Sequence, residues 1–206
     1  MKATMKTLSA ILICCFISTI QMYGENIQRP ESENYVKGVE ALNEGNPEAA
    51  YTYLNAEINE HPDNGYAHCY MALICNFCND TKLALKALNS SLELIPEADT
   101  EYRSFAHYSR GVLLTNLKMW EHAEADLNEA IRLNPEDVEN YKSRAQLYFE
   151  TERYEESLND LTRALKLDSK ADVNDLVLQL MAVAPTSEFM ERITATYQQL
   201  DQVTIH

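Results

Sequence analysis

Glycine and proline are scarce in this chain of 206 residues, with 5 and 6 copies. A fold of many short strands needs turn residues at frequent intervals, so this scarcity argues against such a fold and favours helices. Hydrophobic residues make up 46% of the sequence and charged residues 24%, which suits a globular protein and is too apolar for a disordered one. The length suits one domain of ordinary size.

Basic residues are also few, because 17 lysines and arginines face 32 aspartates and glutamates and leave a net charge of −15. Nucleic acids and anionic lipid headgroups both need compensating cations on the protein. The charge balance therefore argues against either as a partner, and we expect another protein or peptide instead.

Long hydrophobic runs are absent except for one near the N-terminus, from Leu8 to Ile20, which follows Lys2 and Lys6. The run has the length of a signal-peptide core and is shorter than the roughly 20 residues of a membrane span. We predict a signal peptide over residues 1–24, with the cleavage position open because Gly24 is small and Met22 is not. A lipoprotein signal is disfavoured, since no small residue precedes Cys14 or Cys15.

This signal predicts export, most simply to the periplasm or cell envelope of a Gram-negative bacterium, and otherwise secretion. No other segment of the sequence is long and apolar enough to span a membrane.

Motifs for chemistry are missing as well: there is no Gly-rich phosphate loop, no G-x-S-x-G and no H-E-x-x-H. His68 and His107 have no metal-ligand spacing with other residues, and we interpret them as packed between helices. We expect no catalytic residue, no metal and no cofactor.

One C-x-x-C sequence, Cys75 to Cys78, provides the alternative of an exported thiol-redox protein. It is predicted to lie at the end of a helix, where the dipole disfavours a thiolate. With Cys69 the exported chain has three cysteines, so at least one is unpaired within a monomer, and a free buried thiol or an intermolecular bond both stay open.

A period of 34 residues runs through the chain, with one insertion of five residues near 99–103. Three columns share the same steps of 34, 39 and 34: Pro62, Pro96, Pro135 and Ser169; Ala50, Ala84, Ala123 and Ser157; and Leu54, Leu88, Leu127 and Leu161. Ala123, Leu127, Ala130 and Ile131 have the spacing of an amphipathic helix, which ends before Pro135. Each repeat therefore predicts two helices, with a small residue where they approach.

In these features the chain resembles the tetratricopeptide repeat family, with repeats at 31–64, 65–98, 104–137 and 138–171. The third repeat matches the family pattern with Gly111, Leu114, Trp120, Ala123, Leu127, Ala130 and Pro135, and the fourth with Tyr141, Ala145, Tyr148, Tyr154, Ser157, Leu161 and Ala164. The first departs most, because Lys37 and Ala41 replace large apolar residues. The resemblance implies an all-α, right-handed superhelical solenoid of stacked antiparallel helix pairs.

We predict that residues 172–206 form a degenerate fifth hairpin that caps the array. Two apolar helical stripes, separated by a break at Pro185, indicate it. The first consists of Val173, Leu176, Val177, Leu180 and Met181, and the second of Phe189, Ile193 and Tyr197. The alternative is that this tail fills the protein's own groove.

The family binds partners on a concave surface lined by the first helix of each repeat. At the matching positions this chain places an apolar stripe, from which we predict a partner-binding groove: Tyr35, Val39, Tyr66, Tyr70, Leu73, Phe77, Phe105, Tyr108 and Val112. Val36, Leu42 and Cys69 share that face, and the fourth repeat is polar there. An apolar surface that packing does not require predicts binding, although burial by curvature or by the tail is the alternative.

Some tetratricopeptide domains clamp a partner's carboxylates with basic residues on this face, and no such clamp is present here. We therefore predict a non-enzymatic adaptor, scaffold or assembly factor that binds an apolar peptide or helix, with basic flanks meeting the acidic rim. A self-associating structural protein, whose groove takes the C-terminal helix of a second copy, is a further alternative. Arg110 and Arg144 stand at the same position of the third and fourth repeats, and Asp126 and Asp160 share another position. This recurrence predicts a repeated ion pair between helices.

Overall fold

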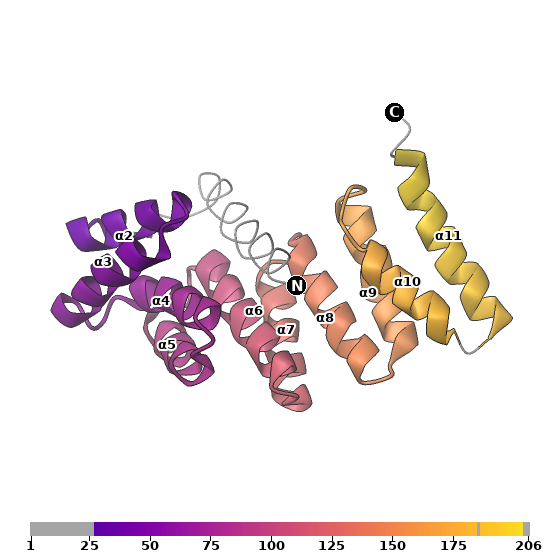
Figure 1. Cartoon of the computed structure of the whole chain (residues 1–206), viewed down its shortest axis with the longest axis horizontal. Helices are drawn as coiled ribbons and strands as arrows, with labels where there is room; N and C mark the ends of the chain where they lie inside the picture. The colour runs from indigo at the N-terminus through magenta and orange to yellow at the C-terminus, as the bar shows by residue number, and fades with distance from the viewer. Residues whose placement is uncertain (1–26, 185, 204–206) are drawn as a thin grey trace. The chain divides into compact units, whose positions relative to one another are not determined.

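The computed structural model describes residues 27–184 and 186–203, and in those ranges the regular elements are all helices. The predicted signal peptide lies outside the described residues. The helices are α2 (Glu33–Asn43), α3 (Pro47–Glu60), α4 (Gly65–Phe77), α5 (Thr81–Leu94), α6 (Thr100–Asn116), α7 (Trp120–Leu133), α8 (Val138–Glu150), α9 (Tyr154–Leu167), α10 (Asn174–Val183) and α11 (Ser187–Val203) (Figure 1).

The chain divides into two compact units between Ala106 and His107, inside α6. In the N-terminal unit α2 packs on α3 and α4 packs on α5, with a further contact between α3 and α4. In the C-terminal unit α8 packs on α7 and α9, and α10 packs on α9 and α11. The predicted helix pair is therefore the building block of both units.

The small-residue column lies where the two helices of each pair approach. Ala50, Ala84, Ala123 and Ser157 are completely buried, and the leucine column four residues later is buried with them. A Cβ atom added at Gly38 would lie 2.6 Å from Cγ of Leu54, and one at Gly111 would lie 2.7 Å from Cγ of Leu127. Because real Cβ atoms do not approach so closely, the leucines and glycines set the short distance between the paired helices.

The turn between the paired helices has the same backbone conformation at one position in all four repeats. The fifteenth residue of each repeat has a positive φ: 72° at Gly45, 62° at Asn79, 59° at Lys118 and 60° at Glu152. A residue of this conformation commonly ends a helix, and glycine and asparagine adopt it with the least strain. The lysine and the glutamate adopt it too, so the fold imposes the turn where the local sequence does not favour it.

The inserted residues extend one helix. α4 and α8 begin at the first residue of their repeats, Gly65 and Val138, whereas α6 begins at Thr100, four residues before Ser104. Since an α-helix has 3.6 residues per turn, the insertion adds about one turn to the N-terminus of α6. Asp99 accepts a hydrogen bond from the backbone N–H of Tyr102 at 3.2 Å, as a helix-capping side chain does.

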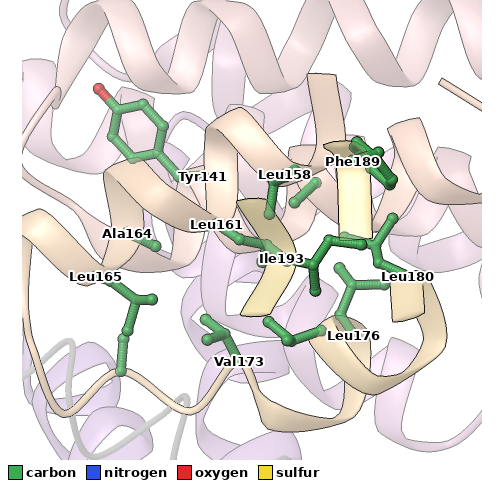
Figure 2. Packing of buried hydrophobic residues seen from close by; sticks show 13 residues of the cluster. Tyr141, Leu158, Leu161, Ala164, Leu165, Val173, Leu176, Leu180, Phe189 and Ile193 are labelled. Atoms are coloured by element: carbon green, nitrogen blue, oxygen red, sulfur yellow. The ribbon is translucent and has the colours of Figure 1, made fainter. Parts of the chain in front are cut away.

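The C-terminal hairpin α10–α11 packs on the last repeat (Figure 2). Leu176 and Leu180 of α10 lie beside Phe189 and Ile193 of α11, and Leu158 and Leu161 of α9 belong to the same buried cluster. The buried members of both predicted stripes are at most 7% exposed. Burial of these apolar side chains stabilises the last repeat, whose apolar face would otherwise be exposed to water. Tyr197, predicted for the second stripe, lies outside the residues whose side chains are described.

The predicted all-α fold of paired helices is confirmed. The first helix of the first repeat forms in spite of Lys37, whose side chain lies on the surface and pairs with Glu33 one turn earlier. Among the described residues no helix has the length and hydropathy to cross a membrane.

Candidate partner-binding surface

The nine residues predicted to line the groove differ widely in exposure. Phe77 is 44% exposed, and Val39, Leu73 and Val112 are partly buried. The five aromatic residues other than Phe77 are at most 8% exposed: Tyr35, Tyr66, Tyr70 and Phe105 of the N-terminal unit and Tyr108 of the C-terminal unit. These five rings are therefore buried within their own units, and the aliphatic residues and Phe77 remain in reach of a partner.

Four tyrosines of the N-terminal unit form one cluster. The rings of Tyr66 and Tyr102 meet edge to face with centroids 4.8 Å apart, and those of Tyr70 and Tyr102 lie 6.2 Å apart. Tyr35 of α2 joins through Tyr70, at 6.1 Å. The hydroxyls of Tyr70 and Tyr102 share a hydrogen bond of 2.9 Å. Aromatic pairs of this geometry stabilise a structure beyond the area they bury, so the cluster joins α2, α4 and the start of α6 firmly.

A buried carboxylate, Asp99, holds the edge of this tyrosine cluster. Its Oδ2 accepts hydrogen bonds from the Tyr66 hydroxyl at 3.0 Å and from Nε of Arg29 at 3.1 Å. Nη2 of Arg29 donates to the other oxygen at 3.2 Å and to Glu101 at 2.8 Å. The guanidinium carbon also lies 4.6 Å from the centroid of the Tyr102 ring. A buried carboxylate needs such partners, because alone it would lose its hydration without compensation.

The ionisation of this cluster is fixed over the physiological range. Burial is the main cause that raises the pKa of Tyr35, Tyr70 and Tyr102 above the ordinary tyrosine value. Burial opposes the charge of Arg29, but its hydrogen bonds to Asp99 and Glu101 outweigh this and raise its pKa. The phenols therefore remain neutral and can donate hydrogen bonds, and the guanidinium remains charged.

Four apolar side chains remain accessible on the first helices of the N-terminal unit. Val36 is 39% exposed and Phe77 is 44% exposed, while Val39 and Leu73 are partly buried. All four lie at the family's concave positions on α2 and α4, which Tyr35 and Tyr70 bring together. This set, Val36, Val39, Leu73 and Phe77, is called the apolar strip below.

The corresponding face of the C-terminal unit is more polar. Tyr108 is buried near Glu139 and Ser143 of α8, and its pKa is raised, mainly by burial. Glu139 forms an ion pair with Lys142 at 2.8 Å, and Gln146 donates to Glu150 at 3.0 Å. Val112 is the predicted groove residue of this unit that stays partly exposed.

The predicted arginine–aspartate pairs form with matching geometry. Nε of Arg110 lies 2.7 Å from Oδ2 of Asp126, and Nε of Arg144 lies 2.7 Å from Oδ2 of Asp160. The second contact, from Nη2 to Oδ1, is 2.8 Å in each pair. Since both aspartates are less than 10% exposed, these are nearly buried two-point pairs between the helices of one repeat, as predicted.

Comparison with known proteins agrees with this architecture. A family model described as tetratricopeptide repeat matches residues 106–137 and 139–170. Solved structures with the same fold include MamA 41-end from Desulfovibrio magneticus RS-1, with 19% identity over 82% of this chain and 94% of that one and a TM-score of 0.66. Pseudomonas aeruginosa pilF shares 19% identity over 82% and 74%, also with a TM-score of 0.66. The chain therefore shares the fold of these structures, and residues 106–137 and 139–170 match the tetratricopeptide repeat itself.

A third structure of this fold is YrrB, described as a tetratricopeptide protein with an unusual peptide-binding site. It shares 20% identity over 71% of this chain and 73% of that chain, with a TM-score of 0.60. No curated protein matches the sequence.

Two of the three cysteines described in the structure have the environment of structural thiols. Cys69, Cys75 and Cys78 are all unbonded; the first two are buried and Cys78, at the C-cap of α4, is exposed. Burial raises the pKa of Cys69 to about 12 and, as the main cause, that of Cys75 to about 11. Since the thiolate is the reactive species, the geometry disfavours a redox centre here.

The two histidines interpreted as packing residues are half-buried and have partners. Nδ1 of His107 donates to Asp126 at 2.9 Å, and Nε2 of His68 lies 3.0 Å from the carbonyl oxygen of Pro62. Within residues 27–184 and 186–203, no three His, Cys, Asp or Glu side chains gather as metal ligands do.

Sequence reasoning missed Arg29, Asp99 and Tyr102. Asp99 and Tyr102 lie in the insertion, which has no counterpart in the other repeats, and Arg29 precedes the first repeat. A periodic pattern gives no position to such residues. The signal that could have found them is the inserted sequence itself, in which Asp99 stands where a helix-capping residue is expected.

Proposed function

We propose that this tetratricopeptide protein is a non-enzymatic interaction module that binds an apolar helix or extended segment of another polypeptide on the apolar strip. With a cleaved signal over residues 1–24, it acts as an adaptor or assembly factor in the periplasm or cell envelope. Proteins of this repeat family are interaction modules in general, and the peptide-binding site for which YrrB is described gives a precedent on the same scaffold.

The observation that carries the proposal is the exposure of Val36 and Phe77 on a face where helix pairing does not need them. Both side chains are about two-fifths exposed, although the neighbouring Tyr35 and Tyr70 are almost completely buried. Apolar side chains clustered on a soluble surface are a common mark of a binding site. A partner that covers the strip removes this area from water at about 25 cal/mol per Å².

The mechanism is pre-organisation. The strip stands on the tyrosine cluster, whose rings and hydroxyls hold one another at fixed distances. A surface that does not reorder on binding loses little conformational entropy, so more of the contact energy appears as affinity. The net charge of −15 adds attraction for a partner with basic residues beside its apolar ones.

A paired-variant experiment tests the proposal. The full chain, tagged at its C-terminus in its native cells, is compared with Val36→Asp/Phe77→Asp and with Leu83→Asp/Leu94→Asp. The second variant is a matched control, since Leu83 and Leu94 are each 38% exposed but lie on α5, the second helix of its pair. We expect the same co-purified protein with the wild type and the control, and at least a tenfold loss with the strip variant. Equal loss in both variants, or in neither, contradicts the proposal.

The structure disfavours the two alternatives that the sequence left open, a thiol-redox protein and a self-associating structural protein. A thiol-redox function needs a reactive thiolate, and burial holds the Cys75 pKa at about 11. Self-association through the C-terminal helix needs a free apolar stripe, and Phe189 and Ile193 are at most 1% exposed within their own chain.

A further inference from the structure

The inserted turn of α6 places acidic and aromatic groups around one arginine. Asp99, Glu101 and Tyr102 all come from the five-residue insertion, and Tyr66 of α4 completes the set. These four residues, Tyr66, Asp99, Glu101 and Tyr102, are called the arginine site below. The other repeats have no equivalent, because their first helices begin about one turn later in the repeat.

The arginine site binds the guanidinium of Arg29 through three hydrogen bonds and one aromatic ring. Two carboxylates accept three hydrogen bonds of 2.8 to 3.2 Å from Nε and Nη2 of Arg29. The Tyr102 ring faces the guanidinium carbon at 4.6 Å, and Tyr66 orients Asp99 through its hydroxyl. A lysine ammonium is a point charge that cannot make the two-point contact with Asp99, so this arrangement selects arginine.

The present occupant lies on a segment without regular secondary structure. Residues 27–32, which precede α2, have no helix or strand, and Arg29 is their anchor on the arginine site. Its side chain keeps 24% exposure, so Arg29 remains partly accessible to solvent while it is bound. A single side chain on a segment without regular structure is a form in which a partner peptide could also present an arginine.

We propose that the arginine site is a recognition site for an arginine on an extended, basic segment of the partner, and that Arg29 is an intramolecular occupant which such an arginine displaces. This inference rests on the proposed function and adds the chemistry of its ligand. Tyr35 and Tyr70 connect the arginine site to the helices that carry the apolar strip, so one segment with apolar residues and one arginine can engage both. The anionic chain attracts a basic segment before contact.

Peptide binding to full-length Arg29→Ala tests the inference. The probe is the hexapeptide Ile-Gln-Arg-Pro-Glu-Ser, which has the sequence of residues 27–32, and the control peptide has alanine in place of arginine. We expect Arg29→Ala to bind the arginine peptide at least tenfold more tightly than the wild type does, and the alanine peptide not to bind. Adding Glu101→Gln to Arg29→Ala should lower the affinity for the arginine peptide several-fold. Equal binding of the two peptides, or equal binding by wild type and variant, overturns the inference.

Arg29→Lys provides a second background that keeps a cation beside buried Asp99, should Arg29→Ala fail to fold. It should bind the arginine peptide more tightly than the wild type, and failure to do so overturns the inference equally. The strip variant Val36→Asp/Phe77→Asp distinguishes the two proposals. If the wild type captures its partner through the strip while no variant of Arg29 binds the peptide, the inference falls and the proposed function stands.

Discussion

The two units solve the same packing problem with different chemistry. In both repeats of the C-terminal unit the seventh and twenty-third residues face each other across the helix pair, as arginine and aspartate in two-point contact. In the N-terminal unit the register carries no such ion pair. The four combinations in chain order are Lys37 with Tyr53, Met71 with Ala87, Arg110 with Asp126, and Arg144 with Asp160.

The second of these combinations is the informative one. Met71 and Ala87 are each 5% exposed, so buried apolar residues stand at the repeat positions that carry a nearly buried ion pair in the C-terminal unit. Lys37 of the first repeat instead lies on the surface, 5.8 Å from the centroid of the Tyr53 ring. The fold therefore requires filled space between the helices and not charge. In the N-terminal unit a partly buried arginine pairs instead with two carboxylates at the arginine site.

Replacing one member of an ion pair should have the largest effect. Arg144→Met leaves Asp160 buried without its cation and should lower the free energy of unfolding of the C-terminal unit by about 3 kcal/mol. Arg144→Met/Asp160→Ala transplants the apolar pair of the second repeat and should recover stability to within about 1 kcal/mol of wild type. Trp120, the one tryptophan of the chain, lies in this unit and reports its unfolding in urea by fluorescence.

A double variant as unstable as Arg144→Met alone would contradict the comparison. It would mean that the repeat needs the ion pair itself and that the second repeat is stabilised by some other means.

Removal of Arg29 should have the next largest effect. Arg29→Ala leaves Asp99 with the Tyr66 hydroxyl and the Tyr102 N–H, so the loss should be about 2 kcal/mol, below the cost of a fully orphaned buried charge. Arg132→Ala is the control, because its side chain is 67% exposed and its pair with Glu129 is a surface one worth less than about 1 kcal/mol. Urea unfolding followed by circular dichroism compares them, and equal losses would contradict the buried role of Arg29.

The pH dependence separates two aspartates of the C-terminal unit. For Asp126 burial acts to raise the pKa, but the contacts from Arg110 and His107 outweigh it and lower the pKa. A lowered folded-state pKa adds stability above the unfolded value of about 4 and loses it as the pH falls further. Asp126→Asn should therefore be less stable than wild type, and the difference in free energy of unfolding should increase as the pH rises from about 3 to about 7.

Asp137 should show the opposite sign, because burial raises its pKa. A raised folded-state pKa lowers stability as the pH rises through it. The free energy of unfolding of Asp137→Asn should therefore increase relative to that of wild type as the pH rises over the same range. Parallel urea titrations at each pH measure both differences, and slopes of the same sign would contradict the assignment.

The smallest effect is expected at the cysteines. Cys75→Ser/Cys78→Ser should change partner capture by less than about twofold, since no disulfide joins the two residues. In the native protein at about pH 8, iodoacetamide should label Cys78 and leave Cys69 and Cys75 nearly unmodified, because burial raises their pKa values and hides their sulfurs. Peptide mass spectrometry reads the labelling, and rapid modification of Cys75 would revive the redox alternative.

Periodicity explains which features could be predicted from the sequence. Ala123, Leu127 and the Arg110–Asp126 pair recur at fixed spacing, so their roles followed from the repeat, and the structure confirms the buried column and the ion pair. The exposure of individual residues on the first-helix face did not follow. Tyr35 and Phe77 share that face, but one contributes to a ring cluster and the other is the last residue of α4.

The arginine site could not be predicted because it depends on long-range pairing. Arg29 and Asp99 are 70 residues apart, and neither has a counterpart in another repeat. The insertion was visible in the sequence, but its effect depends on whether five residues form a loop or extend a helix. The helical outcome placed Tyr102 against Tyr66, which no local pattern indicated.

The most direct test of the proposed binding surface is site-specific photocrosslinking in living cells. A photoreactive phenylalanine analogue is placed at position 77 of the full chain, at the end of α4, or at position 94, at the end of α5, two positions of similar exposure. We expect one defined crosslinked polypeptide from position 77 that is absent at position 94 and lost when Val36→Asp is added. A crosslink from position 94 alone, or the same product from both positions, would contradict binding on the apolar strip.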